Sequence, residues 1–211
     1  MKQKTITLLA LLLITVQYMW AWEGSGTQAD PYKIQSSADW QEFAIKVSMG
    51  NSYQGTFFKM TNDIDANGIN AGTSTFAFNG TFDGGNHTLT YNRGENNAQG
   101  VQAVHDYCAP FVLLNGATIR HLRVTGTIYS KHMHAAGIAS LITGANPTTI
   151  DDCHVSSHLF GTNNLRNDAS FGGLVGEVLS TRSASPVIKN CSFTGSFGGW
   201  VTSSSGMVAF T

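Results

Sequence analysis

ATIRHLRVTGTI at residues 117–128 is the first of three copies of one pattern, and the others are TTIDDCHVSSHL at 148–159 and PVIKNCSFTGSF at 186–197. A shorter match follows each copy: GIAS at 137–140, GLVG at 173–176 and GMVA at 206–209. The copies contain only strand signals. A strand repeat of about 30–40 residues indicates a fold built from stacked strands.

The copies align on an isoleucine, after which apolar residues recur at fixed positions. Leu122 comes three residues after Ile119, and every second residue from there to Ile128 is apolar or small. This alternation puts one face of a strand in the core and the other in water. The predicted core positions of the three copies and of the GLVG match are Ile119, Leu122, Val124, Ile150, Cys153, Val155, Ile188, Cys191, Phe193, Gly173, Leu174 and Gly176.

The step of three after each isoleucine breaks the alternation and predicts a corner. His121, Asp152 and Asn190 share one corner position and should stack as a polar ladder, since Asp and Asn tolerate turn geometry. We therefore predict an all-β fold, a right-handed parallel β-helix, because right-handed crossovers are the strong default. An antiparallel β-sandwich also has many short strands, but its strands do not repeat side chain for side chain.

Two segments carry a family resemblance. GLVG at 173–176 resembles the GLUG repeat of bacterial surface proteins, and IKNC at 188–191 is similar to the other half of that repeat. Residues 22–34 and 80–89 resemble the N-terminal cap of secreted Bacteroidetes β-helix proteins. The resemblance implies a parallel β-helix and export, and little about activity. Some relatives carry a zinc peptidase, but this chain has no His-Glu-x-x-His motif, so that activity is not carried over.

Residues 1–21 have the pattern of a secretory signal peptide. Lys2 and Lys4 precede an apolar run from Ile6 to Val16, and Ala21 offers a small residue at the expected cut. No later segment approaches the roughly 20 apolar residues of a membrane span, so we expect a secreted protein, extracellular or on the outer cell surface. Residues 22–211 carry 10 Lys and Arg against 13 Asp and Glu, a balance that does not indicate nucleic acid.

The remaining chain divides by pattern. Residues 22–90 are expected to form the N-terminal cap and first coils, 91–110 a polar projecting loop, and 111–211 the GLUG-like repeats. Ser36 and Asp39 resemble a capping box, and Trp40, Phe43 and their neighbours fall on one helical face. This short amphipathic helix should cover the open edge of the first coil.

The preferred binding residues are aromatic. Tyr129 and Phe160 follow Ile128 and Leu159 at the same outward position, so their rings should stack at the surface, and Trp200 is a further candidate from a loop. Such rings beside polar side chains suit a sugar or a protein partner. The alternative is simple packing beneath the adjoining loops.

Asp63, Asp65 and Asn67 offer oxygen ligands at alternate positions before a glycine, like the first half of a calcium loop. Ser74 stands where a bidentate acid is needed, so a polar turn is the preferred interpretation. Apart from this calcium hypothesis, no cofactor is expected.

Weaker patterns concern zinc, a thiol and hydrolytic acids. The zinc candidates are His132, His134, His154 and His158. The thiol candidate is Cys108 with His105 as its base, and the candidate acids are Asp63, Asp65 and Asp83. Zinc needs three or four ligands in fixed geometry, and glycoside hydrolysis needs two acids about 5–9.5 Å apart. The three acids could cluster in early turns, but no Arg or Lys set of the kind a lyase needs flanks them, and two histidines in a surface loop are commoner than a zinc site, so no catalytic residue is predicted.

Cys153 and Cys191 share one inward position in neighbouring copies, roughly 4.8 Å apart by strand spacing. A disulfide is compatible with that distance. Two buried thiols are the preferred interpretation, because like side chains stack in parallel.

These features favour a β-helix domain that is a non-enzymatic adhesion or recognition scaffold for a glycan, or for a host or neighbouring cell-surface protein. The alternative is the N-terminal part of a carbohydrate-active enzyme, a polysaccharide lyase or glycosidase, whose active site needs further coils.

Overall fold

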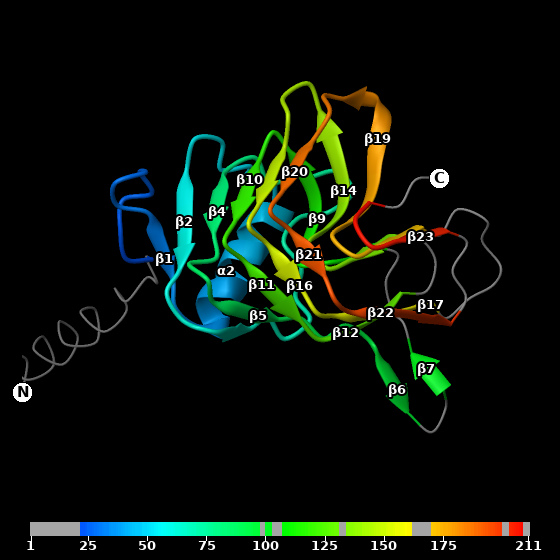
Figure 1. Cartoon of the computed structure of the whole chain (residues 1–211). Helices are drawn as coiled ribbons and strands as arrows, with labels where there is room; N and C mark the ends of the chain where they lie inside the picture. Colours follow the sequence, from blue (N-terminus) through cyan, green and yellow to red (C-terminus); the bar gives the residue numbers. More distant parts are fainter. Residues whose placement is uncertain are drawn as a thin grey trace, which may run out of the picture.

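The computed structural model describes residues 22–97, 100–102, 107–130, 134–161, 170–199 and 203–208, so the signal peptide expected at 1–21 lies outside it. Within these ranges the chain forms parallel sheets, one antiparallel hairpin and helix α2 (Ser37–Ser48) (Figure 1). The fold is all-β, rich in parallel pairs and repeat-like. No helix in the described residues is long and apolar enough to cross a membrane.

The strands fall into five parallel sheets and the hairpin. The first sheet contains β1 (Tyr32–Ile34), β2 (Phe57–Met60), β4 (Thr81–Asp83), β10 (Thr118–Arg120), β15 (Thr149–Asp151) and β20 (Val187–Lys189). The second contains β3 (Ile64–Asp65), β5 (Thr88–Thr90), β11 (Arg123–Thr125), β16 (His154–Val155) and β21 (Ser192–Phe193). The third contains β12 (Thr127–Ser130), β17 (His158–Gly161) and β22 (Ser196–Gly199).

The fourth sheet contains β8 (Tyr107–Cys108), β13 (His134–Ala136), β18 (Ser170–Gly172) and β23 (Ser203–Ser205). The fifth contains β9 (Phe111–Asn115), β14 (Ala139–Gly144) and β19 (Val175–Ser183), and the hairpin is β6 (Glu95–Asn97) with β7 (Gly100–Gln102).

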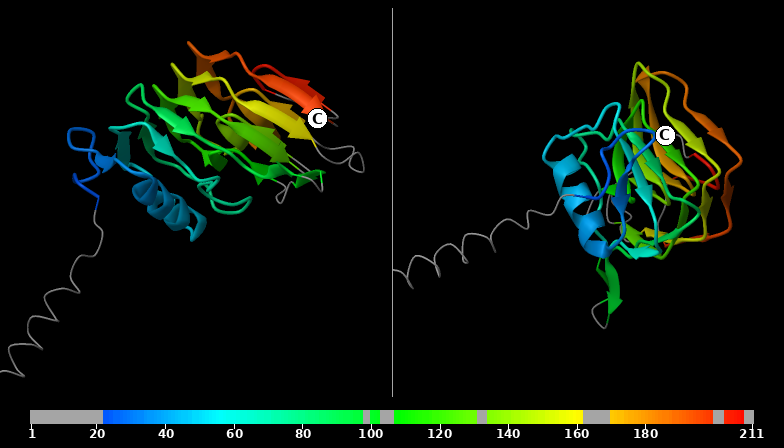
Figure 2. Two further views of the ribbon diagram at one scale, coloured as in Figure 1. Left: turned by 90° about the horizontal axis from the view of Figure 1, so that it is seen from below. Right: turned by 90° about the vertical axis from the view of Figure 1, so that its left-hand side faces the viewer.

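Each of the first four parallel sheets takes one strand from each of the three copies, and the fifth takes β14 and β19 from the first two copies. In the first sheet Phe58, Phe82, Ile119, Ile150 and Ile188 pair in turn at one register position. The second sheet pairs its own inward residues in the same order: Leu89, Val124, Val155 and Phe193. The copies therefore lie residue on residue, and the strands follow one another in chain order (Figure 2).

The corner between the first two sheets has left-handed backbone in every copy. The φ angle is +49° at His121, +50° at Asp152 and +56° at Asn190. The amide of His121 donates to the carbonyl of Asp151 in the next copy, and that of Asp152 donates to Lys189 in the copy after it. Asp and Asn adopt this conformation more readily than most residues, which explains why they recur at the corner.

The glycines of the shorter matches allow neighbouring copies to approach closely. A Cβ atom on Gly137 would lie 2.3 Å from Val155, and one on Gly173 would lie 2.4 Å from Phe193. A Cβ on Gly176 would lie 2.6 Å from the carbonyl oxygen of Ser140. The glycine of one copy thus makes room for the inward side chain of the next.

Helix α2 begins at its Ser36 cap, whose hydroxyl accepts a hydrogen bond from the amide of Asp39. Its buried face contains Trp40, Phe43, Ala44 and Val47. The ring centroid of Trp40 lies 5.8 Å from those of Phe82 and Phe111. The helix therefore packs on the core at the end of the stack where the first strands lie (Figure 2).

Residues 91–110 have more structure than the expected loop. Tyr91 is fully buried, and Arg93 forms a parallel bridge with Ile128. The hairpin β6–β7 projects from the body (Figure 1), and β8 belongs to the fourth sheet. The sequence alone indicates a loop here because polar, Asn-rich strands lack the apolar alternation that identifies a half-buried strand.

Candidate functional site

The outward aromatic pair lies on the third sheet. Tyr129 of β12 pairs in register with Phe160 of β17, and their ring centroids are 5.4 Å apart at an interplanar angle of 28°. Both residues are half-buried. Gly198 is next in register on β22, and a Cβ atom there would lie 2.4 Å from the ring of Phe160. The two stacked rings, which need a glycine beside them, form an aromatic column on the outer face.

A polar column runs beside the rings, two residues earlier in each strand. Thr127, His158 and Ser196 pair in register there. His158 Nδ1 lies 2.7 Å from Ser196 Oγ, and the amide of Thr127 donates to Asn92 Oδ1 at 2.9 Å. Aromatic carbon beside hydroxyl and imidazole groups matches the two requirements of a sugar, an apolar contact and hydrogen-bond partners.

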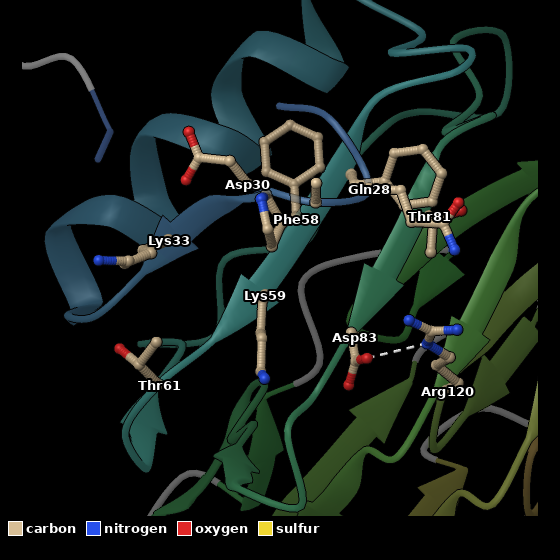
Figure 3. Close-up of a pocket in the computed structure, with 12 residues that line it drawn as sticks. Gln28, Asp30, Lys33, Phe58, Lys59, Thr61, Thr81, Asp83 and Arg120 are labelled. Atoms are coloured by element: carbon tan, nitrogen blue, oxygen red, sulfur yellow. Dashed lines mark hydrogen bonds and ion pairs between the residues drawn. The ribbon is translucent and has the colours of Figure 1, made fainter. Parts of the chain in front are cut away.

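A second feature is a groove on the outer face of the first sheet, beside the N-terminal loop (Figure 3). Its volume is about 410 Å³. Lys33, Lys59, Asp83 and Arg120 line it and occupy one register column across β1, β2, β4 and β10. The groove thus combines charges that are far apart in sequence.

Asp83 is held by three donors in this groove. Arg120 Nε donates to Oδ2 at 2.8 Å, the amide of Gly85 donates to Oδ1 at 2.9 Å, and His121 Nδ1 lies 3.1 Å from Oδ1. Burial raises the pKa of the Asp83 carboxyl, but the hydrogen bonds from Gly85, His121 and Arg120 outweigh it and leave the pKa below its usual value. An ionised carboxylate of this kind is a poor general acid.

The acids of the calcium hypothesis bind backbone amides. Asp63 Oδ1 accepts a hydrogen bond from the amide of Thr88 at 2.8 Å, and Asp65 Oδ1 accepts one from the amide of Asn67 at 2.8 Å. Asn67 has a φ of +51°. In the described part of the chain, no three His, Cys, Asp or Glu side chains form a group that could hold a metal ion. The segment has the geometry of a polar turn.

The three described histidines of the zinc hypothesis lie on three different sheets. His134, on β13, is buried, with Nδ1 2.5 Å from Ser170 Oγ and Nε2 3.2 Å from the Glu177 carboxylate. His154 belongs to β16 in the second sheet and His158 to β17 in the third. They do not share a common site, because each sheet turns its side chains in its own direction.

Three sequence candidates, His105, His132 and Trp200, lie outside the described residues. Cys108, expected near His105, is buried on β8, and its thiol lies 3.7 Å from the carbonyl oxygen of Tyr129.

Cys153 and Cys191 are free thiols in the structure. The amide of Cys153 donates to Cys191 Sγ at 3.4 Å, and the Cys191 thiol lies 3.0 Å from the carbonyl oxygen of Lys189. Hydrogen bonding to Cys191, together with burial, raises the pKa of the Cys153 thiol. Cys153 is therefore part of the core, whereas Cys191, which was also expected to be buried, is only partly buried against it.

The sequence patterns did not identify Lys59 and Arg120 as site residues. Their signal is positional, because each follows an inward residue, Phe58 or Ile119, and therefore points outward. That signal becomes visible only when β2, β4 and β10 are known to be neighbours.

Comparison with known proteins adds one distant likeness. No protein-family model and no curated protein sequence matches the chain. One solved structure that resembles it is a Bacteroides ovatus protein described as a "putative immunoglobulin A1 protease", with 15% sequence identity and a TM-score of 0.44. The match covers 88% of this chain and 73% of that one. This likeness is too weak to assign an activity to the chain.

Proposed function

We propose that this chain is an exported, right-handed parallel β-helix with GLUG-type repeats. In this proposal it is a non-enzymatic recognition scaffold that binds a glycan on the surface of the cell or outside it. The observation that carries the proposal is the stacked Tyr129–Phe160 pair on an outward face, with the polar column of Thr127, His158 and Ser196 beside it.

The acids support a non-catalytic role. Asp83 is on the first sheet and bound to Arg120, whereas Asp63 and Asp65 hold backbone amides beside the second sheet. A glycosidase needs two carboxyl groups that face one cleft and differ in protonation. The contacts of these three acids do not provide such a pair.

The test is a screen of immobilised glycans and matrix proteins with the chain, followed by titration of the best ligand. The Tyr129→Ala, Phe160→Ala double variant should bind at least about tenfold more weakly, because aromatic contacts contribute on the order of 1 kcal/mol each. Phe76→Ala is the matched control, since this ring is also exposed but lies outside the column. Equal binding by the double variant and the wild type would contradict the proposal, as would release of new sugar ends from the ligand.

A further inference from the structure

The groove of Figure 3 has a floor of outward side chains and a wall formed by the N-terminal loop. Phe57 and Lys59 point outward from β2, the first half-buried and the second exposed. Arg120 lies on the strand side of the groove, and Asp30 lies on the loop side. The groove therefore has an apolar part and two ends of different charge.

Two of its charges are already neutralised within the protein. Lys33 Nζ lies 2.8 Å from Glu23 Oε2, and Asp83 is bound by Arg120 and other donors. Lys59 differs, because its side chain makes no hydrogen bond or ion pair within the described residues. Arg120 contacts Asp83 through Nε, which leaves its two terminal amino groups for a ligand. Among the cations that line the groove, Lys59 is thus the one without a matching anion in the described residues, and Arg120 adds neutralised but still available N–H donors.

We propose that this groove is a subsite for an acidic sugar, a ring that carries a carboxylate or a sulfate ester. The anionic group binds Lys59, because an ammonium group forms charge-assisted hydrogen bonds with such anions, and hydroxyl groups of the ring accept hydrogen bonds from the terminal amino groups of Arg120. The ring packs on Phe57, and its hydroxyl groups donate to Asp30 on the loop side. This inference rests on the proposed glycan-binding function and adds a second site, on a different sheet from the aromatic column.

The size and lining of the groove favour a sugar over a simple anion. Its volume of about 410 Å³ lies within the roughly 300–1,000 Å³ typical of small-molecule sites. Gln28, Thr61 and Thr81 also line the groove and add amide and hydroxyl groups to it. A free inorganic anion would use the cations alone, whereas a sugar also uses the ring of Phe57 and these polar groups.

The test measures binding of three tetrasaccharides by titration calorimetry: one of uronic acid units, one sulfated and one neutral. Lys59→Met should weaken binding of the uronate or the sulfated probe about fivefold to tenfold and leave the neutral probe unchanged. Added salt should weaken the same acidic probe, because the contact is near the surface. The probe that responds more strongly shows whether carboxylate or sulfate is the natural group.

Lys189→Met is the matched control. Lys189 occupies the same register column on β20, and its loss changes the net charge equally, but it lies outside the groove. Acidic probes that bind Lys59→Met and Lys189→Met equally well would overturn the inference. Lys59-dependent binding of a glutamate hexapeptide in preference to both acidic sugars would overturn it too, by showing a peptide site.

The outcomes separate this inference from the proposed function. Glycan binding that depends on Tyr129 and Phe160 but not on Lys59 leaves the function intact and removes the acidic subsite. Acidic-sugar binding that depends on Lys59 but not on the aromatic column keeps the subsite and removes the column as the binding face. A wild-type chain that binds no glycan of any kind contradicts both.

Discussion

The two ends of the strand stack bury equivalent residues to different degrees. At the first end, Phe58 and Phe82 are fully buried beneath Trp40 and Phe43 of helix α2. At the other end, Ile188, the counterpart of Phe82 on β20, is only partly buried. The helix covers one end, and in the described part of the chain β20 is an edge strand with no strand beyond it.

The difference shows that a repeat position does not fix burial by itself. Cys153 and Val155 of the second copy are 0% and 1% exposed, whereas Cys191 and Phe193 at the same positions of the third copy are partly buried. All four side chains are apolar, so the presence of a neighbouring copy decides how much of each side chain's surface is removed from water. Since burial sets the hydrophobic stabilisation, the middle copies should tolerate change less than the last.

The largest effect is expected from a charge in the middle copy. Val155→Asp should prevent soluble folding, because an unpaired buried charge costs several kcal/mol. Phe193→Asp, at the equivalent position on β21, should give soluble protein of reduced stability. Circular dichroism and the yield of soluble protein measure both.

Ser156→Asp is the control for Val155→Asp, because the side chain of Ser156 is exposed and is next to Val155 in the chain. It should fold like the wild type. If Val155→Asp and Phe193→Asp were equally soluble, burial would not differ between the copies and the comparison of the two ends would fail.

A smaller effect is expected at the glycines of the shorter matches. Gly137→Ala places a methyl group 2.3 Å from Val155 and should reduce the free energy of unfolding by about 1–3 kcal/mol, as overpacking does. Gly206 is its counterpart in the last copy, and a Cβ there meets nothing within 4 Å. Gly206→Ala should therefore leave the urea midpoint unchanged or slightly raised. An equal loss of unfolding free energy in both variants would contradict the difference between the two ends of the stack.

The smallest effect is electrostatic and compares Asp83, near the helix, with Asp151, near the last strand. Both have a pKa below the usual value, Asp83 through the balance described above and Asp151 through hydrogen bonds from Asn190 and Lys189. A carboxyl whose pKa is lower in the folded than in the unfolded protein stabilises the fold when it is ionised. This stabilisation is present above the unfolded pKa of about 4 and is lost as pH falls through the folded pKa.

Asp83→Asn should therefore lower stability by about 1–2 kcal/mol at neutral pH and converge with the wild type in acid, because the Asp83 side chain is only 14% exposed. Asp151→Asn should change stability less, since its partner Lys189 is exposed and such pairs contribute little. Thermal unfolding midpoints between pH 3 and pH 7 test both. A constant difference across that range would show that Asp83 acts by packing and not by charge.

The sequence predicted the strand register because the period of two and the corner residues recur in every copy. Ile119, Ile150 and Ile188 are the clearest case, since their pairing follows from alignment of the copies alone. The hairpin at 95–102 was missed because a polar strand pair has no apolar face to identify it. The same reasoning explains why helix α2 was predicted, since its apolar face repeats at helical spacing.

Of the two candidate sites, the aromatic pair could be predicted from the sequence and the groove could not. Tyr129 and Phe160 could be paired from sequence because both lie in regular copies, at one outward position. Lys59, Asp83 and Arg120 could not, because Lys59 and Asp83 precede the regular copies and their strands become neighbours only in space. The groove depends on the N-terminal loop, whose course no periodicity specifies.

Helix α2 also gives the chain an order of assembly in time. It lies near the N-terminus, so the ribosome completes Trp40 and Phe43, with β1 and β2, before any of the three regular copies exists. Each later copy then meets an edge that has already formed, and its contacts are mainly with the segment made just before it. The third copy is made after the other two, and in the described residues its inward side chains are the most exposed to water. A chain of this design therefore makes its helix-covered copies before the copy that is least buried.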